Sequence, residues 1–493
     1  MKTALLLIAG SLLILIVILA VNTANFESRQ IEAEPADVSA FDSGAIAERL
    51  SRGLKLHTIS HSLDGPIEAE AFFALHAQLA SDYPLTHKTL VRETVSDYSL
   101  LYTWEGTKPE LPAALLLAHQ DVVPVETGSE DAWEQPPYSG HIDATHVWGR
   151  GAMDDKGSLF CIMEAVEGLI ARGYQPERTV LLAFGHDEEL GGPQGATQIA
   201  ELLASRGIKA EYVLDEGGAV TEGTLSMLDS PVAVIGIAEK GSVSIDLVVE
   251  TLGGHSSMPP RQTGIGILSA AIATLEANPV PGGIAGPVEL MFNHIGPELD
   301  FPINMVMANL WLFRPVLERV FASDPSMDAM QRTTTAATII NGGVKTNVLP
   351  SRVKATVNFR ILPGDTHDSV FEHVVGTIAD DRIQVTKRRE SRNPSPVSPV
   401  DSLGFKAIQK TVRDYFPTAI VTPYLVMGGT DSRYYSEIST NLYRFAPFLY
   451  NNEDRERIHG TNERIAIDTL GRAAGFYTRV IELTTAPGAA NSL

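Results

Sequence analysis

The sequence predicts an α/β protein, in which buried strands alternate with helices, with a smaller α+β unit inserted into it. Three short apolar runs, at 114–118, 179–184 and 211–214, are typical of buried strands. Residues 159–172 and 196–206, which lie between these runs, have apolar side chains at helical spacing. Alternation of this kind predicts a largely parallel sheet with helices packed on it.

The pattern changes near residue 239. Residues 243–250 and 354–361 alternate between apolar and polar in strand fashion, and a helical stretch separates them. We therefore expect a smaller domain over 239–363, inserted into a discontinuous catalytic domain made of 46–238 and 364–493.

The N-terminus carries an apolar segment. Residues 4–21 form an uncharged run whose length suits a membrane-spanning helix of about 20 residues better than the apolar part of a signal peptide, about 7–15 residues. Asn22-Thr23-Ala24 could still hold a cleavage site, so residues 1–25 are an anchor or a removed signal. Lys2 before the run and acidic residues in the linker 26–45 after it predict a cytoplasmic N-terminus. The protein body is then exported, either membrane-anchored or, after cleavage, secreted or periplasmic.

Charge and cysteine content exclude several classes of function. The chain has 38 Lys+Arg and 60 Asp+Glu, a net charge of −22, which argues against binding of nucleic acid or of an anionic surface through a basic face. Its one cysteine, Cys161, excludes a disulfide framework, a four-thiolate iron–sulfur cluster and a cysteine-rich zinc site. Any metal ion must be held by His, Asp and Glu.

Acidic and histidine-containing clusters mark the predicted site. Most follow strand-like runs or glycine-rich turns, where open α/β sheets place their sites. Carboxylates gathered there without basic partners need a cation, since like charges disfavour one another's ionisation. Oxygen and imidazole ligands without thiolates favour Zn²⁺, with Mn²⁺ or Co²⁺ as alternatives. The clusters are His119-Gln120-Asp121, Asp154-Asp155, Asp187-Glu188-Glu189, Asp215-Glu216 and His459-Gly460-Thr461-Asn462-Glu463.

These residues allow two arrangements. One histidine with two or three carboxylates makes a single metal site, whereas two histidines and three carboxylates, one of them bridging, make a pair of sites about 3.5–4 Å apart. The spacing of His119 and Asp121 lets the carboxylate hold the imidazole's other nitrogen and orient the ring.

The motifs HQDVVPV, WGRGAMDDKG, FGHDEELGG, LDEGG and GGHSSMPP occur in the order of a known family. Over about residues 50–480 the sequence resembles the dinuclear zinc hydrolases that include aminoacylase, carboxypeptidase S and glutamate carboxypeptidase. It is most similar to the branch of carboxypeptidase S and the secreted N-fatty-acyl-amino-acid synthase/hydrolases. The resemblance implies a three-layer zinc-hydrolase catalytic domain with an inserted lid or dimerisation domain.

The resemblance also implies two Zn²⁺ per subunit. His119 and Asp215 would hold one ion, Glu189 and His459 the other, and Asp154 would bridge both.

Catalytic and substrate-binding roles follow from the same resemblance. Glu188 would be the general base, which takes a proton from the attacking water and delivers it to the leaving amine, and Asp121 would orient His119. His255 would polarise the scissile carbonyl. The residues implied to hold the substrate carboxylate or lie beside the substrate are Asn347, Arg360 and Gly429.

The predicted activity is metal-dependent hydrolysis of an amide bond that releases an amino acid with a free carboxylate. Two substrate classes remain open: N-acyl amino acids, including long fatty-acyl ones whose hydrolysis is reversible, and short peptides cut by a carboxypeptidase or dipeptidase. The Met- and aromatic-rich stretch 279–330 is either extra core or a subunit interface, or else the wall of a pocket for a long apolar group. A non-catalytic membrane-tethered binding protein is the alternative of another class, and Glu188 argues against it. The resemblance also implies a homodimer through the inserted domain, although a monomer could equally contain this domain.

Overall fold

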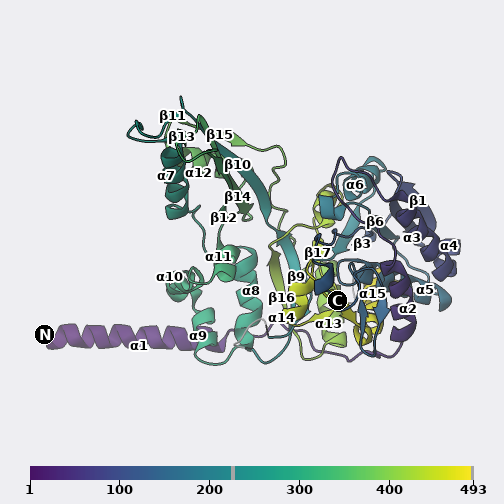
Figure 1. Ribbon diagram of the computed structural model, residues 1–493. Coiled ribbons are helices and arrows are strands. Elements are labelled where there is room, and N and C mark those ends of the chain that lie inside the picture. The colour runs from purple at the N-terminus through teal and green to yellow at the C-terminus, as the bar shows by residue number, and fades with distance from the viewer. Residues whose placement is uncertain (224–227, 490–493) are drawn as a thin grey trace.

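The computed structural model describes residues 1–223 and 228–489. Its main feature is a ten-stranded sheet (Figure 1). In spatial order the strands are β1 (Val91–Val95), β2 (Ser99–Trp104), β6 (Val180–Gly185), β3 (Ala113–His119), β7 (Ala210–Asp215), β17 (Leu442–Arg444), β9 (Val232–Glu239), β8 (Val220–Thr221) and β18 (Leu449–Tyr450), with β16 (Ile420–Val426) paired to β9.

Strand direction gathers the ends of the central strands. β3 runs parallel to β6 and to β7, and β17 runs parallel to β7. His119, the last residue of β3, lies opposite Gly185, the last residue of β6. The segments that follow β3, β6 and β7 therefore emerge at one edge of the sheet.

Helices cover both faces of this sheet. Along β3, Leu116 packs into the core on one face and Leu115 into the core on the other, as expected for a strand buried on both sides. This gives three layers and confirms the predicted α/β class. The first face carries α2 (Ser43–Leu54), α5 (Lys156–Ala171), α13 (Leu403–Tyr415) and α15 (Ile467–Thr485), and the second carries α6 (Ala196–Ser205).

The smaller unit is a four-stranded antiparallel sheet that stands beside the main one (Figure 1). Helices α7 (Gly264–Ala277) and α12 (His367–Ile378) pack on it. A short ribbon of β11 (Gly254–His255) and β13 (Val348–Leu349) forms its far end. The order of the sheet is β12 (Thr334–Gly342), β14 (Arg352–Ile361), β10 (Gly241–Glu250) and β15 (Ile383–Lys387).

This unit does not end at residue 363, the boundary expected from the sequence. Val370 and Val374 of α12 are buried in its core, and β15 pairs with β10 up to Lys387. The strand-like pattern of 354–361 marks an inner strand of the sheet, and the chain returns once more to add an edge strand.

Part of the inserted stretch packs elsewhere. Helices α8 (Pro287–Ile295), α9 (Ile303–Ala308), α10 (Leu310–Phe321) and α11 (Pro325–Gln331) follow α7 in the chain. Met291 and Ile295 of α8 share a hydrophobic core with Val232 and Ile420 of the main sheet. The Met-rich stretch therefore extends the catalytic unit.

Helix α1 (Lys2–Ala24) projects away from the body and has no buried residue (Figure 1). Among the described residues it is the one helix long and apolar enough to cross a membrane. The predicted linker lies against α13, where Arg413 Nε donates to the Ile31 carbonyl (3.0 Å) and Gln409 Nε2 to the Arg29 carbonyl (2.9 Å). It ends at Asp42, whose carboxylate caps α2.

Three helices and one small sheet complete the named elements. They are α3 (Ala69–Asp82), α4 (Pro84–Thr89), α14 (Asn452–Arg457) and a three-stranded sheet of β19 (Arg464–Ala466), β5 (His146–Trp148) and β4 (His141–Ile142).

Candidate metal centre

The sequence clusters meet at the edge where the central strands end. His119 closes β3, and Glu216 follows the last residue of β7. Glu189 lies in a single 3₁₀ turn (Glu188–Leu190) after β6, and Asp154 lies in the turn that leads into α5. His459 follows α14, so it reaches this edge from a distant part of the chain.

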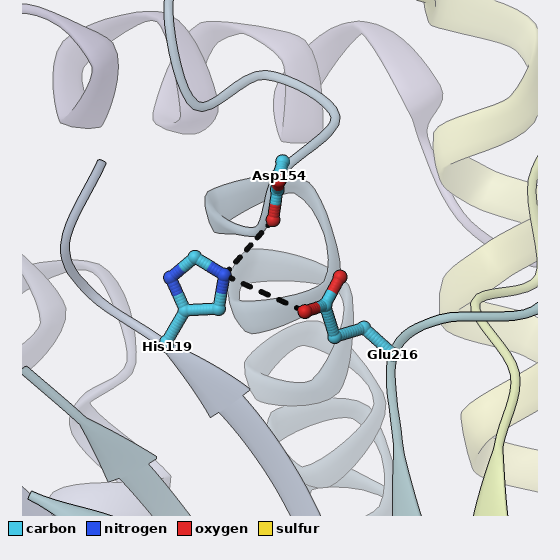
Figure 2. A group of neighbouring side chains, drawn as sticks. All are labelled: His119, Asp154 and Glu216. Carbon is cyan, nitrogen blue, oxygen red and sulfur yellow. Dashed lines mark hydrogen bonds and ion pairs between the residues drawn. The ribbon is translucent and has the colours of Figure 1, made fainter. Parts of the chain in front are cut away.

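One group consists of His119, Asp154 and Glu216 (Figure 2). His119 Nε2 is 2.9 Å from Asp154 Oδ1 and 3.8 Å from Glu216 Oε1. The ligand atoms of all three residues lie within 4.8 Å of one another, close enough to surround one ion.

A second group shares Asp154 with the first. His459 Nε2 is 2.9 Å from Asp154 Oδ2 and 3.2 Å from Glu189 Oε2. The two oxygens of Asp154 thus face different histidines, one in each group. This is the arrangement of a carboxylate that bridges two metal ions, and it matches the second of the two arrangements considered from the sequence.

The structure does not bring Asp215, the residue assigned from the sequence, into the first group; its neighbour Glu216 occupies that place. The Asp215 side chain is buried, and its Oδ2 accepts the backbone N–H of Ser432 (2.6 Å). Successive residues at a strand end point in opposite directions, so only one of two adjacent acids can face His119.

Asp121 positions both sides of the centre. Its backbone carbonyl lies 3.0 Å and its Oδ1 3.4 Å from His119 Nδ1. Its carboxylate also accepts the backbone N–H groups of Glu188 and Glu189, each at 3.1 Å. The hydrogen bond to the imidazole thus comes from the backbone carbonyl of Asp121, whereas the carboxylate, expected from the spacing to hold the ring, lies next to it and fixes the acidic turn.

Glu463 supports the loop that carries Asp154. Its Oε1 accepts the N–H groups of Gly151 (3.0 Å) and Met153 (2.9 Å), and its Oε2 pairs with Arg150 (2.6 Å). The side chain is fully buried. Glu463 belongs to the fifth acidic cluster, but sequence reasoning gave it no role, because the loop it supports is about three hundred residues away in the chain.

The donor set fits divalent cations. Burial is the main cause that raises the pKa of Glu188, and the negative charge of Asp431 adds to it. Burial also raises the pKa of Glu216, and there the charge of Asp154 adds to it. Hydrogen bonds to Asp154 and Glu189 raise the pKa of His459 to about 10. Within the described part of the chain, Glu189 Oε1 is buried without a hydrogen-bond partner. Imidazoles and carboxylates are metal ligands, and a bound cation would offset the mutual repulsion of carboxylates that lie this close together.

Two predicted substrate-binding residues lie far from the metal centre. His255 and Asn347 are exposed at the tip of the smaller unit, where Ser256 N–H donates to the Asn347 carbonyl (3.1 Å). His255 Nδ1 is 2.7 Å from Ser257 Oγ. The ribbon that holds them lies well away from β3 and β7 (Figure 1). This structure does not bring them to the metals.

The other two lie at the junction of the two units. Arg360 is exposed on β14, and Gly429 follows β16. A Cβ on Gly429 would come 2.6 Å from Arg392 Nη2 and 2.1 Å from Arg433 Nη1, so a larger residue here would displace the two guanidinium groups from their present positions.

Arg392 and Arg433 were missed by sequence reasoning. Among the described residues, the buried Arg392 Nε, Arg433 Nε and Arg433 Nη1 have no hydrogen-bond partner. Burial lowers the pKa of Arg392, and the positive charge of the neighbouring Arg433 lowers it further. Two such guanidinium groups provide the geometry that a carboxylate prefers. The available sequence signal was Arg433 in the motif GGTDSR, two residues after Asp431.

A cavity begins at the first metal group and adjoins a second one. The smaller, about 220 Å³, is lined by Asp154 and Glu216 at one end and otherwise largely by apolar or glycine residues. The larger, about 640 Å³, is lined by Met291, Met327, Met330 and other residues of the Met-rich stretch. The cavities share the wall residues Thr221, Val234, Tyr424 and Arg455.

Fold and site together define a metal-dependent amide hydrolase: three layers, strand ends that gather imidazoles and carboxylates, and a shared carboxylate between two groups. The protein-family model described as "Peptidase family M20/M25/M40" matches residues 115–483 of the sequence. The chain belongs to this family. An enzyme, rather than a non-catalytic binding protein, is what this membership supports.

Curated relatives are similar over almost the whole chain. A probable carboxypeptidase S-like 2 of Dictyostelium discoideum is 39% identical over 97% of this chain and 93% of its own length. The N-fatty-acyl-amino acid synthase/hydrolase PM20D1 of Xenopus tropicalis is 41% identical over 89% of this chain and 85% of its own. Both belong to the branch that the sequence motifs indicated.

Solved structures share the fold. The M20 family metallo-carboxypeptidase Sso-CP2 from Sulfolobus solfataricus is 19% identical with a TM-score of 0.65, covering 89% of this chain and 98% of that one. Human carnosine dipeptidase 1 is 16% identical with a TM-score of 0.59, covering 90% and 97%.

Proposed function

We propose that this enzyme hydrolyses N-acyl amino acids with long apolar acyl chains, and that it also catalyses the reverse condensation. The observation that carries the proposal is the pair of adjoining cavities that leads from Asp154 and Glu216, past Tyr424, to the methionine-lined wall. Methionine side chains are flexible and apolar, so they adapt to chains of different length. The similarity to N-fatty-acyl-amino acid synthase/hydrolases adds support.

The amino-acid end of the substrate would bind on the opposite side, over Gly429. Arg392 and Arg433 would hold its free carboxylate through charge-assisted hydrogen bonds, with Arg360 close by. The scissile amide would then lie between the guanidinium groups and the cavities, beside the metal centre.

Two metal ions would be held by the two groups described above, with Asp154 shared and Glu216 in place of Asp215. We propose Zn²⁺, because oxygen and imidazole donors without a thiolate suit it, with Mn²⁺ or Co²⁺ as substitutes. When bound, such ions lower the pKa of water and stabilise negative charge on a carbonyl oxygen.

Glu188 is the proposed general base. It accepts a proton from the attacking water and donates it to the nitrogen of the leaving amino acid. The raised pKa that burial gives this carboxyl suits a group that must both accept and return a proton. Asp121 holds the backbone N–H of Glu188 and so positions the base.

The proposed location is a membrane surface outside the cytoplasm, with α1 as an uncleaved anchor. The C-terminal end of α1 is bonded to the body, since Asn22 Nδ2 donates to Asn309 Oδ1 (2.9 Å). A removed signal peptide has no need for such contacts. If α1 is cleaved, the enzyme is secreted or periplasmic. A homodimer would form through the smaller sheet, whose edge strand β12 is largely exposed.

A short-peptide carboxypeptidase is the second candidate, favoured by the similarity to carboxypeptidase S-like proteins. The deciding experiment compares metal-loaded enzyme on N-acyl amino acids from acetyl to palmitoyl with dipeptides that share the C-terminal residue. Each methylene that enters the cavities contributes about 0.8 kcal/mol, so kcat/KM should rise by up to about fourfold per methylene. Equal or faster turnover of the dipeptides would overturn the acyl-chain proposal.

Two variants and one analogue sharpen this comparison. Val234→Trp narrows both cavities and should shorten the preferred acyl chain while sparing the N-acetyl substrate, whereas Val91→Trp on the distant edge strand β1 serves as control. Capping the substrate carboxylate as an amide should lower kcat/KM by about 10- to 100-fold, because a charged hydrogen bond is lost.

A further inference from the structure

Helix α10 is apolar on two sides. Its inner side packs into the core beside the larger cavity, where the ring of Phe321 lies tilted against that of Phe292 with 5.4 Å between ring centroids. Its outer side carries four large apolar side chains at helical spacing, which we call the α10 strip. They are Trp311 (59% exposed), Leu312 (37%), Val316 (56%) and Val320 (55%).

An exposed strip of this kind needs a partner. A helix with apolar residues on both sides is normally buried on both sides. Contiguous apolar surface on a soluble body is uncommon and marks a site of interaction with protein or membrane. The inner side of α10 already has its core, so the outer strip is unexplained by the fold.

The strip lies directly beside the end of α1. Asn309, which is fully buried, accepts hydrogen bonds at Oδ1 from Asn22 Nδ2 of α1 (2.9 Å) and from Trp311 Nε1 (3.2 Å). Its Nδ2 also donates to the Leu19 carbonyl (3.3 Å). Trp311 and the last turns of α1 are thus bonded to the same buried side chain, and α9 packs against α1 (Figure 1).

Helix α1 sets the level of a bilayer surface. Its 23 residues rise about 35 Å, enough to cross a hydrocarbon core of about 30 Å. A bilayer crossed by α1 would therefore end near Asn22, at the level where Trp311 is attached. Tryptophan with an exposed ring and a bonded N–H is typical of the membrane–water interface. Arg319, between Val316 and Val320, adds a basic group suited to lipid headgroups.

We propose that the α10 strip lies in the surface layer of the membrane that α1 crosses, so that α1 and α10 together hold the larger cavity at the lipid surface. This inference rests on the proposed anchor. Residues 324–330, which line the larger cavity, begin three positions after the end of α10. Long-chain N-acyl amino acids partition into lipid, so the enzyme would meet its substrate where it is concentrated.

Tryptophan fluorescence tests the proposal in the full-length chain. Of the four tryptophans, Trp104, Trp133 and Trp148 are buried, and Trp311 alone is exposed. The chain is reconstituted in phosphatidylcholine vesicles whose acyl chains are brominated near the headgroup or not brominated. We expect quenching in the brominated vesicles, protection from aqueous iodide, and loss of the quenched fraction in Trp311→Phe.

A functional arm uses a matched pair of variants. Val316→Ser/Val320→Ser should lower turnover of a long-chain substrate presented in vesicles and leave turnover of the soluble N-acetyl substrate unchanged. Leu63→Ser/Val91→Ser, at comparably exposed positions remote from α1, should change neither rate. Circular dichroism melts verify that both double variants fold.

Three outcomes overturn the inference. If the protein floats with the vesicles but Trp311 stays accessible to iodide and unquenched by bromine, α1 is an anchor and the strip faces water or another protein. If the protein does not float, the anchor fails and the inference fails with it. If the strip variants and the control variants slow vesicle-bound turnover equally, the strip has no role in lipid access. Hydrolysis of the soluble substrate reports on the proposed function independently in all three.

Discussion

The metal-binding edge of the main sheet and the tip of the smaller unit contrast sharply in how far their side chains are fixed. At the edge, His119 is buried between Asp121 and Asp154, with its ring nitrogens within 3.4 Å and 2.9 Å of their carboxylates. At the tip, His255 is exposed and its ring contacts a neighbouring serine. Both regions carry residues expected to act on the same substrate.

The contrast shows that the metal-binding groups are already in place, whereas two of the residues expected to contact the substrate are not. The groups that would hold the metals lie within one folded unit and are held by backbone hydrogen bonds, which is the preorganisation that catalysis requires. The roles expected for His255 and Asn347 need the tip to approach this centre, either by movement of the smaller unit or from a second subunit. Substitutions in the two regions should therefore change kcat and metal binding to different extents.

The largest expected effect is at the metal-binding edge. Glu188→Gln keeps the size of the side chain but removes the base, so kcat should fall by about 10²- to 10⁴-fold. Metal content by atomic spectroscopy and thermal stability should match wild type. Glu201→Gln, on the exposed side of α6, is the control that leaves kcat unchanged. Substantial activity in Glu188→Gln would show that another group transfers the proton.

A second change distinguishes two adjacent acids. Glu216→Gln should weaken binding of one of the two ions by about 10- to 100-fold or more, because even loss of a residue that only bonds a metal ligand costs that much affinity. The value of kcat should fall in proportion to the lost metal. Asp215→Asn should retain both ions and mainly lower thermal stability, because its carboxylate bonds the backbone of Ser432. Metal titration by calorimetry measures both variants. The reverse pattern would restore Asp215 as the ligand.

The smallest expected effect is at the tip. His255→Ala should lower kcat by about tenfold, which is the net contribution of about one hydrogen bond to the carbonyl, with metal content and folding unchanged. His141→Ala, at an exposed position on β4, is the matched control. Wild-type kinetics in His255→Ala would mean that the tip does not reach the substrate and that the metal-binding edge acts without it.

The sequence by itself was informative about residue types and local pattern. The buried strands, the acidic clusters after them and the single cysteine together indicated an α/β sheet whose edge holds a metal through oxygen and nitrogen. These features depend on side-chain chemistry and on short-range periodicity, both of which are present in the sequence alone. They sufficed to gather the five acidic and histidine clusters into one predicted site, and the family resemblance then singled out His119, Asp154, Glu189 and His459 as ligands.

Tertiary structure decided everything that depends on direction and on distant contacts. It selected Glu216 over Asp215 to face His119, gave Glu463 its place beneath the Asp154 loop, and brought Arg392 and Arg433 together over Gly429. It also moved the edge of the smaller unit from residue 363 to the end of β15 and placed the Met-rich helices against the main sheet. The physical reason is common to all: a strand end turns one side chain in and the next one out, and burial is shared between segments far apart in the chain.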